Sequence, residues 1–100
     1  MTVTTNVDGT KLTVTAEGKL GTTSAPELEN AVKNNIKGMT ELIFDFEKLE
    51  YMASAGLRVL LSAAKVMKKQ GSMKIINVTE PVMDVFTFTG MADVMEIEKL

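Results

Sequence analysis

The chain has 100 residues, of which 45% are hydrophobic and 24% are charged, a balance that is ordinary for a globular protein. It contains no Cys and no His, which excludes disulfides, thiol catalysis, Cys/His zinc sites and imidazole acid–base chemistry. The formal net charge of −2 gives no electrostatic basis for binding nucleic acid or an anionic membrane, because those partners usually require a basic face.

The sequence shows neither a targeting segment nor a membrane span. Its first residues lack the basic start and the apolar stretch of a signal peptide, and no segment approaches the roughly 18 apolar residues of a span. We therefore expect a cytoplasmic protein without direct membrane insertion, in which residues 1–100 form a single domain around one core.

The first elements in chain order are a hairpin and a helix. Residues 2–7 alternate as a strand does, Asp8-Gly9 supplies a tight turn, and the alternation resumes through residues 12–16. A loop over residues 18–23 precedes a capping box, in which Ser24 caps a helix and Glu27 reaches back. The apolar spacing predicts that this helix continues to Gly38, which would occupy its C′ position.

The rest of the chain alternates between strands and helices. Residues 41–46 are typical of a buried, central strand, and a helix from near Ser54 to Gln70, stopped by Gly71, leads to a strand over residues 73–78. Thr79 caps a third helix that ends at Gly90, and residues 94–97 form an edge strand or a tail. The fold class is α/β: a small mixed sheet with an N-terminal hairpin, right-handed parallel crossovers and about three packed helices.

Ser54 stands where the second helix begins. There it can cap free backbone N–H groups, or it can carry a phosphate that those groups and the helix dipole favour. Its neighbours Ala53, Ala55 and Gly56 have almost no side chain, so another protein's active site could reach the hydroxyl. Arg58, four residues later, either holds such a phosphate or belongs to a solvated polar stripe.

The residues around Ser54 do not form a hydrolase site. Ser54-Ala55-Gly56 is half of the nucleophile elbow Gly-x-Ser-x-Gly, but Met52 fills the first Gly position and no His is present to act as base. The Asp residues lack calcium-loop spacing and there is no Gly-rich phosphate loop. We expect no enzyme activity, no metal and no cofactor.

The segment over residues 45–60 resembles the signature of the STAS domain family, the sulphate transporter and anti-sigma factor antagonist domains. In that family an Asp-Ser-Ser-Gly-Leu pattern or a close variant lies at a strand-to-helix junction, and here it is similar to Ala53-Ser54-Ala55-Gly56-Leu57. The loop over residues 18–25 and the helix over residues 81–90 also resemble the family. Gly21 and Ala53 stand where antagonists usually carry Asp.

The resemblance implies two alternative functions. In the antagonist branch, a Ser at the position of Ser54 is phosphorylated by a kinase that is also an anti-sigma factor; unphosphorylated protein binds that kinase and frees a sigma factor. A phosphatase acting on Ser54 is a further implied partner. The alternative is a constitutive interaction module, such as a soluble component associated with a membrane transporter, in which Ser54 is only a cap.

The expected site combines the loop before the first helix with the start of the second. Two Met residues, Met52 and Met91, are expected to be exposed, and Gly56→Leu is expected to weaken partner binding more than folding. The expected phosphorylation site is Ser54, and the expected partner-binding residues are Gly21, Thr22, Thr23, Met52, Ala53, Ser54, Ala55, Gly56, Arg58 and Met91.

Overall fold

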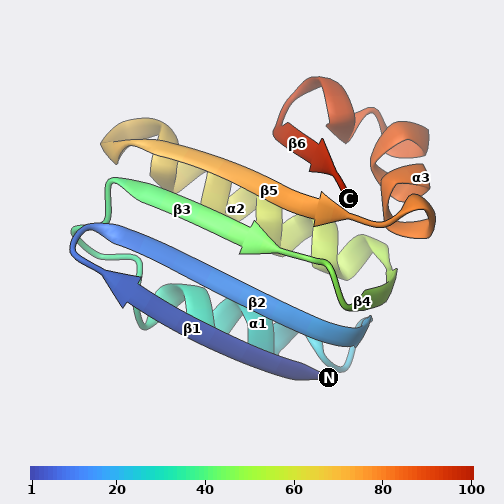
Figure 1. Ribbon diagram of the computed structural model, residues 1–100, viewed down its shortest axis with the longest axis horizontal. Helices are drawn as coiled ribbons and strands as arrows, with labels where there is room; N and C mark the ends of the chain where they lie inside the picture. The colour runs from blue at the N-terminus through green and yellow to red at the C-terminus, as the bar shows by residue number, and fades with distance from the viewer.

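The computed structural model describes residues 1–100 and contains a six-stranded mixed sheet with helices packed on it (Figure 1). The strands are β1 (Thr2–Asp8), β2 (Lys11–Leu20), β3 (Glu41–Asp45), β4 (Leu49–Met52), β5 (Ser72–Val78) and β6 (Glu96–Lys99). The helices are α1 (Ala25–Lys33), α2 (Ser54–Gln70), α3 (Glu80–Thr89) and a short 3₁₀ helix, η1 (Met91–Asp93). This architecture confirms the predicted α/β class.

The sheet has the strand order β1-β2-β3-β5-β6, which makes β3 the central strand as predicted. Strand β1 pairs antiparallel with β2 through the expected hairpin, whereas β2, β3, β5 and β6 run parallel to one another. The last strand, β6, lies at the edge, so the predicted edge strand forms, shifted to Glu96–Lys99. Strand β4, which the sequence did not predict, pairs with the C-terminal end of β2.

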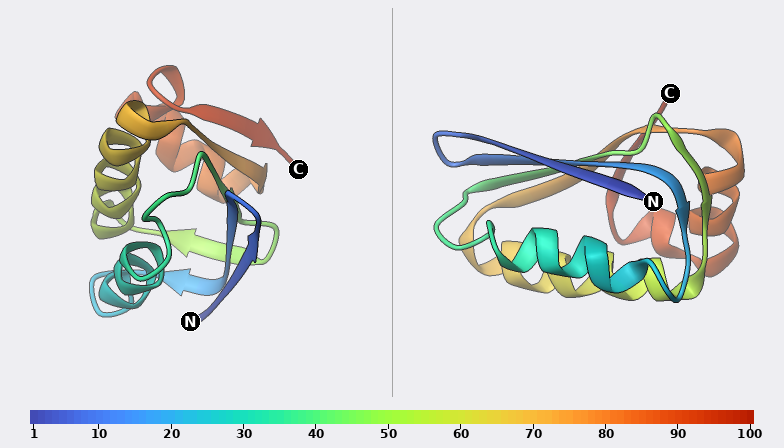
Figure 2. Two further views of the ribbon diagram at one scale, coloured as in Figure 1. Left: turned by 90° about the vertical axis from the view of Figure 1, so that its left-hand side faces the viewer. Right: turned by 90° about the horizontal axis from the view of Figure 1, so that it is seen from below.

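The core lies between the sheet and the helices. Figure 2 shows α1 and α2 side by side under one face of the sheet, with α3 at one end. Alternate residues of the central strands point into this layer, among them Val14, Phe44 and Ile75, each of which has no exposed surface. Register places Val14 beside Phe44 and Phe44 beside Ile75, so these side chains form one continuous row across the sheet.

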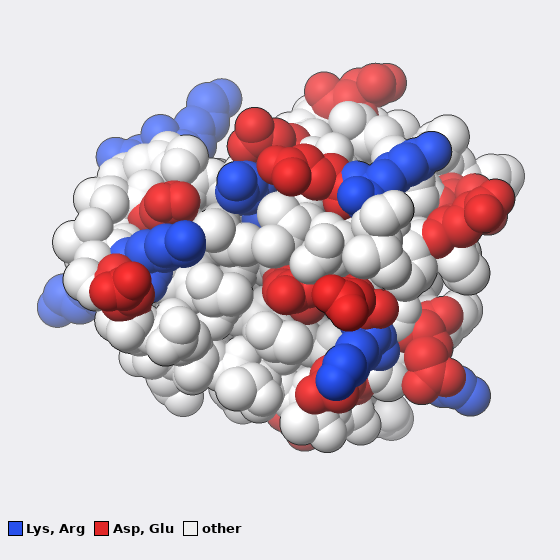
Figure 3. Space-filling model, viewed as in Figure 1, with Lys and Arg blue, Asp and Glu red and all other residues white.

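The other face of the sheet carries no helix and is viewed in Figure 3, where acidic and basic side chains are interspersed. Thr13 and Lys74 flank Ile43 on this face, because they pair with it in the register of β2, β3 and β5. Ile43 is only 5% exposed although it lies outside the main core cluster. The neighbouring strands therefore cover its side chain without a second layer of helices.

Helix α1 ends at Lys33, earlier than the predicted stop at Gly38. The Asn35 side chain turns back and donates from Nδ2 to the carbonyl of Ala31 at 2.7 Å, which satisfies a helix-end acceptor. Gln70 of α2 also donates from Nε2 to two carbonyls in the turn that follows α1, at 2.9 and 2.7 Å. These side-chain amides stabilise a turn where the apolar spacing predicted continued helix.

The C-terminal ends of α2 and α3 lie where the sequence predicts them, whereas the predicted side-chain cap at the start of α3 does not form. Helix α2 stops at Gly71, and α3 follows Thr79 and ends at Gly90, which has the left-handed φ of 79° typical of a helix C-terminus. Thr79 does not cap α3 with its side chain; its hydroxyl instead donates to the carbonyl of Leu49 at 3.4 Å. None of the helices has the length and hydropathy required to cross a bilayer.

Candidate functional site

Ser54 is the first residue of α2 and is exposed, as predicted. The residue in the N-cap position is Ala53, with the extended backbone of φ −100° and ψ 173°, and no side chain caps the helix. The interpretation of Ser54 as a cap is therefore wrong for this structure: one position inside the helix, its side chain does not bond the first-turn amides. The hydroxyl remains accessible from solvent.

The backbone around Ser54 is oriented by the end of β2. Ala53 donates its N–H to the carbonyl of Leu20 at 2.8 Å, and Gly56 donates to the carbonyl of Ala53 at 2.9 Å. Helix geometry leaves the amides of Ser54 and Ala55 without an intrahelical acceptor. Because these amides and the helix dipole favour negative charge, the position can accommodate an anion on the Ser54 oxygen.

The loop between β2 and α1 lies beside the start of α2, and Ser24 holds it in place. The Ser24 hydroxyl accepts a hydrogen bond from the Gly21 N–H at 2.8 Å and donates to the Lys19 carbonyl at 2.9 Å. The predicted capping box is wrong, because this hydroxyl is already engaged by the loop and α1 has no side-chain cap. Ser24 instead fixes the loop that presents Thr22 and Thr23, both exposed.

The loop and the two helix starts enclose a shallow cavity of about 250 Å³. Thr22, Ala55 and Arg58 line it together with residues of α1. Arg58 is exposed and takes part in none of the ion pairs, so its guanidinium is free to meet an anion or an acidic partner. We call the exposed and half-buried residues at this end of the fold the acceptor surface: Gly21, Thr22, Thr23, Ala53, Ser54, Ala55 and Arg58.

Three other expected partner-binding residues are placed differently. Met52 is only 1% exposed, so the expectation that it is exposed is wrong: it belongs to β4 and its side chain packs in the core. Met91 is half-buried in η1, which contacts α3 and β6. Gly56 is buried below the acceptor surface. Met52 and Gly56 can therefore act on a partner only through the shape they give the helix start.

The burial of Gly56 shows that Gly56→Leu must also disturb folding, whereas its effect on partner binding stays a prediction. A Cβ at this position would lie 2.6 Å from Leu20 Cδ2, 2.7 Å from Leu20 Cγ and 3.0 Å from Met52 Cγ. Overpacking of this kind costs typically about 2 kcal/mol, so we expect Gly56→Leu to lower the free energy of unfolding by that amount. Denaturant unfolding measures it, with Ser62→Leu on the exposed side of α2 as the control, expected within about 0.5 kcal/mol of wild type. Equal stability of Gly56→Leu and wild type would contradict the packing described here.

Nearly the whole chain matches a known protein family. The family model described as "STAS domain" matches residues 1–99. The chain belongs to the STAS domain family. The anti-sigma-B factor antagonist of Bacillus subtilis (strain 168) is 32% identical to this STAS domain over 85 residues, which cover 84% of this chain and 78% of that protein.

Solved structures show the same fold. An anti-sigma factor antagonist from Mycobacterium paratuberculosis has a TM-score of 0.89 at 18% identity, covering 99% of this chain and 86% of that one. The anti-sigma factor antagonist SpoIIAA in its unphosphorylated form has a TM-score of 0.83 at 20% identity, covering 96% of this chain and 87% of that one. The Bacillus SpoIIAA in its phosphorylated form has a TM-score of 0.75 at 20% identity, covering 96% of this chain and 90% of that one. These structures share the fold, and the similarity in sequence to an anti-sigma factor antagonist is that of the Bacillus subtilis protein.

Proposed function

We propose that this STAS domain is a cytoplasmic anti-sigma factor antagonist controlled by phosphorylation of Ser54. Unphosphorylated, it binds a kinase-type anti-sigma factor through the acceptor surface and so frees a sigma factor. Phosphorylated on Ser54, it releases that partner, and a phosphatase resets it. The protein acts by binding and carries out no reaction of its own. The observation that carries this proposal is the exposed hydroxyl of Ser54 on the first residue of α2.

The acceptor surface has the properties that such a switch requires. The side chains next to Ser54 are those of Ala53 and Ala55, which leave room for a kinase active site to approach the hydroxyl. The adjacent amides and the dipole of α2 favour the phosphate once it is formed. Arg58, exposed and unpaired four residues along the helix, adds a cation on the same side.

The acceptor surface differs from the usual antagonist pattern in charge. Gly21 and Ala53 contribute no carboxylate, so the surface around Ser54 is less acidic than in antagonists with Asp at those positions. A cognate kinase must then recognise the loop hydroxyls of Thr22 and Thr23 and the Arg58 cation instead. This charge pattern supports a partner specific to this domain.

Ser54→Asp should weaken binding to the cognate anti-sigma factor roughly tenfold, because a desolvated carboxylate is introduced at the interface. Ser54→Ala should bind like wild type, since a methyl group requires no partner. Isothermal titration calorimetry measures both, and Ser62→Asp, which adds the same charge on an exposed position of α2, is the matched control. Wild-type affinity for Ser54→Asp would instead indicate the alternative, a constitutive interaction module such as one associated with a membrane transporter.

A further inference from the structure

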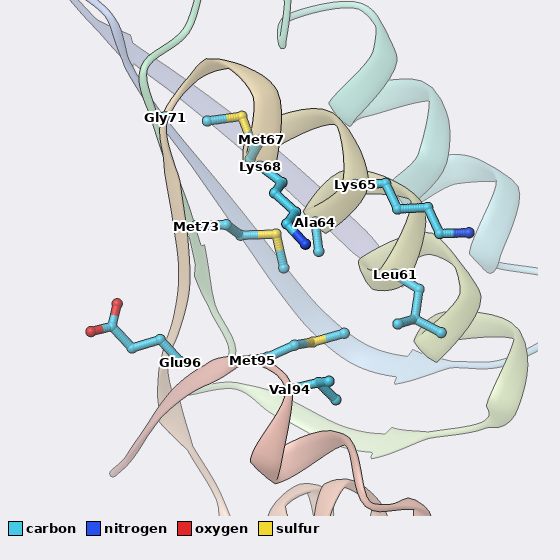
Figure 4. A pocket seen from close by; sticks show the side chains of 10 residues that line it. All are labelled: Leu61, Ala64, Lys65, Met67, Lys68, Gly71, Met73, Val94, Met95 and Glu96. Atoms are coloured by element: carbon cyan, nitrogen blue, oxygen red, sulfur yellow. The ribbon is translucent and has the colours of Figure 1, made fainter.

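A second hollow lies at the other end of α2, between that helix, the start of β5 and the segment before β6. Its volume is about 390 Å³, within the range of roughly 300 to 1,000 Å³ that is typical of small-molecule sites. Figure 4 shows Leu61 and Ala64 of α2 facing Met73 and Met95 across it. The floor is therefore apolar, and Met side chains can adapt their shape to a flexible ligand.

One cation, the Lys68 ammonium, lies at the mouth of this hollow. Lys65 and Lys68 of α2 line it, and neither takes part in an ion pair, but Figure 4 shows the Lys65 side chain extending away from Met73 and Met95. Figure 4 shows the Lys68 side chain extending toward Ala64 and Met73, so that its amino group lies at the hollow, whereas the Glu96 carboxylate points away from it. Val94, 66% exposed, adds an uncovered apolar side chain at the rim.

We propose that this hollow binds one anionic amphiphile, of the class of medium-chain carboxylates. The acyl chain lies against Met73, Met95 and the apolar side of α2, and the carboxylate meets the Lys68 ammonium. A membrane surface is a poorer fit, because lipid-binding segments present clusters of about four to eight cations, whereas only Lys68 points to this mouth, within a chain of net charge −2. Residues 61–68 lie about 10 to 20 Å along α2 from Ser54, so this site is separate from the acceptor surface.

The methionine methyl groups provide a direct test. With ¹³C-methyl methionine in the whole protein, sodium decanoate below its critical micelle concentration should shift the Met73 and Met95 resonances saturably. The resonances of Met1 and Met52, which lie outside the hollow, should not move. Decyltrimethylammonium, with the same chain and the opposite charge, should bind at least tenfold more weakly.

Four variants separate the ligand site from general effects of charge and from the proposed switch. Lys68→Glu should weaken decanoate binding roughly tenfold, whereas Lys37→Glu, the same charge change outside the hollow, should not. Ala64→Phe should abolish the shifts by placing a large side chain in the hollow. Ser54→Ala should bind decanoate like wild type. This result is expected whether or not Ser54 is phosphorylated, so the ligand site and the switch are tested separately. The proposal would be overturned if the Met73 and Met95 resonances did not shift, or shifted only above the critical micelle concentration. It would also be overturned if decyltrimethylammonium bound as tightly as decanoate, or if Lys37→Glu weakened decanoate binding as much as Lys68→Glu.

Discussion

Phosphate on Ser54 is expected to weaken binding of this domain to its anti-sigma factor about 100-fold. The group adds a charge of about −1.5 to −2 at neutral pH. In the free domain, the amides of Ser54 and Ala55 and the dipole of α2 accommodate that charge, so little refolding is needed. At an interface the phosphate is desolvated, and a net loss of roughly 3 kcal/mol corresponds to the 100-fold change.

The measurement is a pair of dissociation constants, for the unmodified and the fully phosphorylated domain with one anti-sigma factor. Thermal unfolding of the two free forms is the control, and we expect the phosphorylated form to be as stable as the unmodified one or slightly more stable. A phosphorylated domain that loses affinity only because it has unfolded would show a lowered midpoint. Equal affinities would place Ser54 outside the interface.

The largest effect on stability is expected for Gly71→Ala. Gly71 ends α2 and passes directly over the backbone of Thr40, and a Cβ there would collide with the Thr40 carbonyl oxygen and lie 2.6 Å from the Thr40 carbonyl carbon. Backbone atoms cannot move aside as a flexible side chain can, and the Ser72 N–H donates to that same carbonyl at 3.0 Å. The two segments must separate, which should lower the free energy of unfolding by about 3 kcal/mol.

Chemical denaturation of Gly71→Ala checks this value, and the thermal midpoint should fall by on the order of 15 °C. Gly21→Ala is the matched control, because a Cβ at Gly21 meets nothing within 4 Å and the same substitution there should leave the midpoint almost unchanged. A Gly71→Ala domain as stable as Gly21→Ala would show that Gly71, after α2, and Thr40, before β3, are not packed as closely as described.

Much of the fold could be predicted from sequence because its signals are local. The alternation over residues 2–7, the Asp8-Gly9 turn and the glycines after α2 and α3 each specify a neighbouring backbone conformation. The order of strands and helices then leaves few topologies, since parallel crossovers are right-handed. The hairpin, the central position of β3 and the ends of α2 and α3 were therefore all confirmed.

The elements that the sequence did not predict depend on distant partners. Strand β4 has Leu49 and Met52 inward with two exposed residues between them, so it lacks the alternation of an ordinary strand. Its pairing with the end of β2 includes a shift in register next to Gly18, which only the assembled sheet reveals. Similarly, the turn after α1 is held by Gln70, which donates to the carbonyl of Ile36. The two residues are thirty-four positions apart in the sequence.

The candidate site was predicted in position more accurately than in detail. The small residues around Ser54 correctly indicated an exposed helix start, but they could not show that Ala53 takes the cap position and that Gly56 faces Leu20. Ser24 is the residue whose role the sequence obscured. Its spacing from Glu27 is typical of a capping box, whereas its hydroxyl holds the loop that carries Thr22 and Thr23.

Phosphate transfer decides whether Ser54 is the phosphate acceptor of a binding switch. The domain is incubated with its kinase-type anti-sigma factor and ATP, the intact mass is read, the modified residue is mapped, and the remaining complex is measured in the same sample. We expect one phosphate, on Ser54, with loss of the complex, and neither change in Ser54→Ala. An unmodified wild-type domain, or a phosphate on another residue, would contradict this expectation.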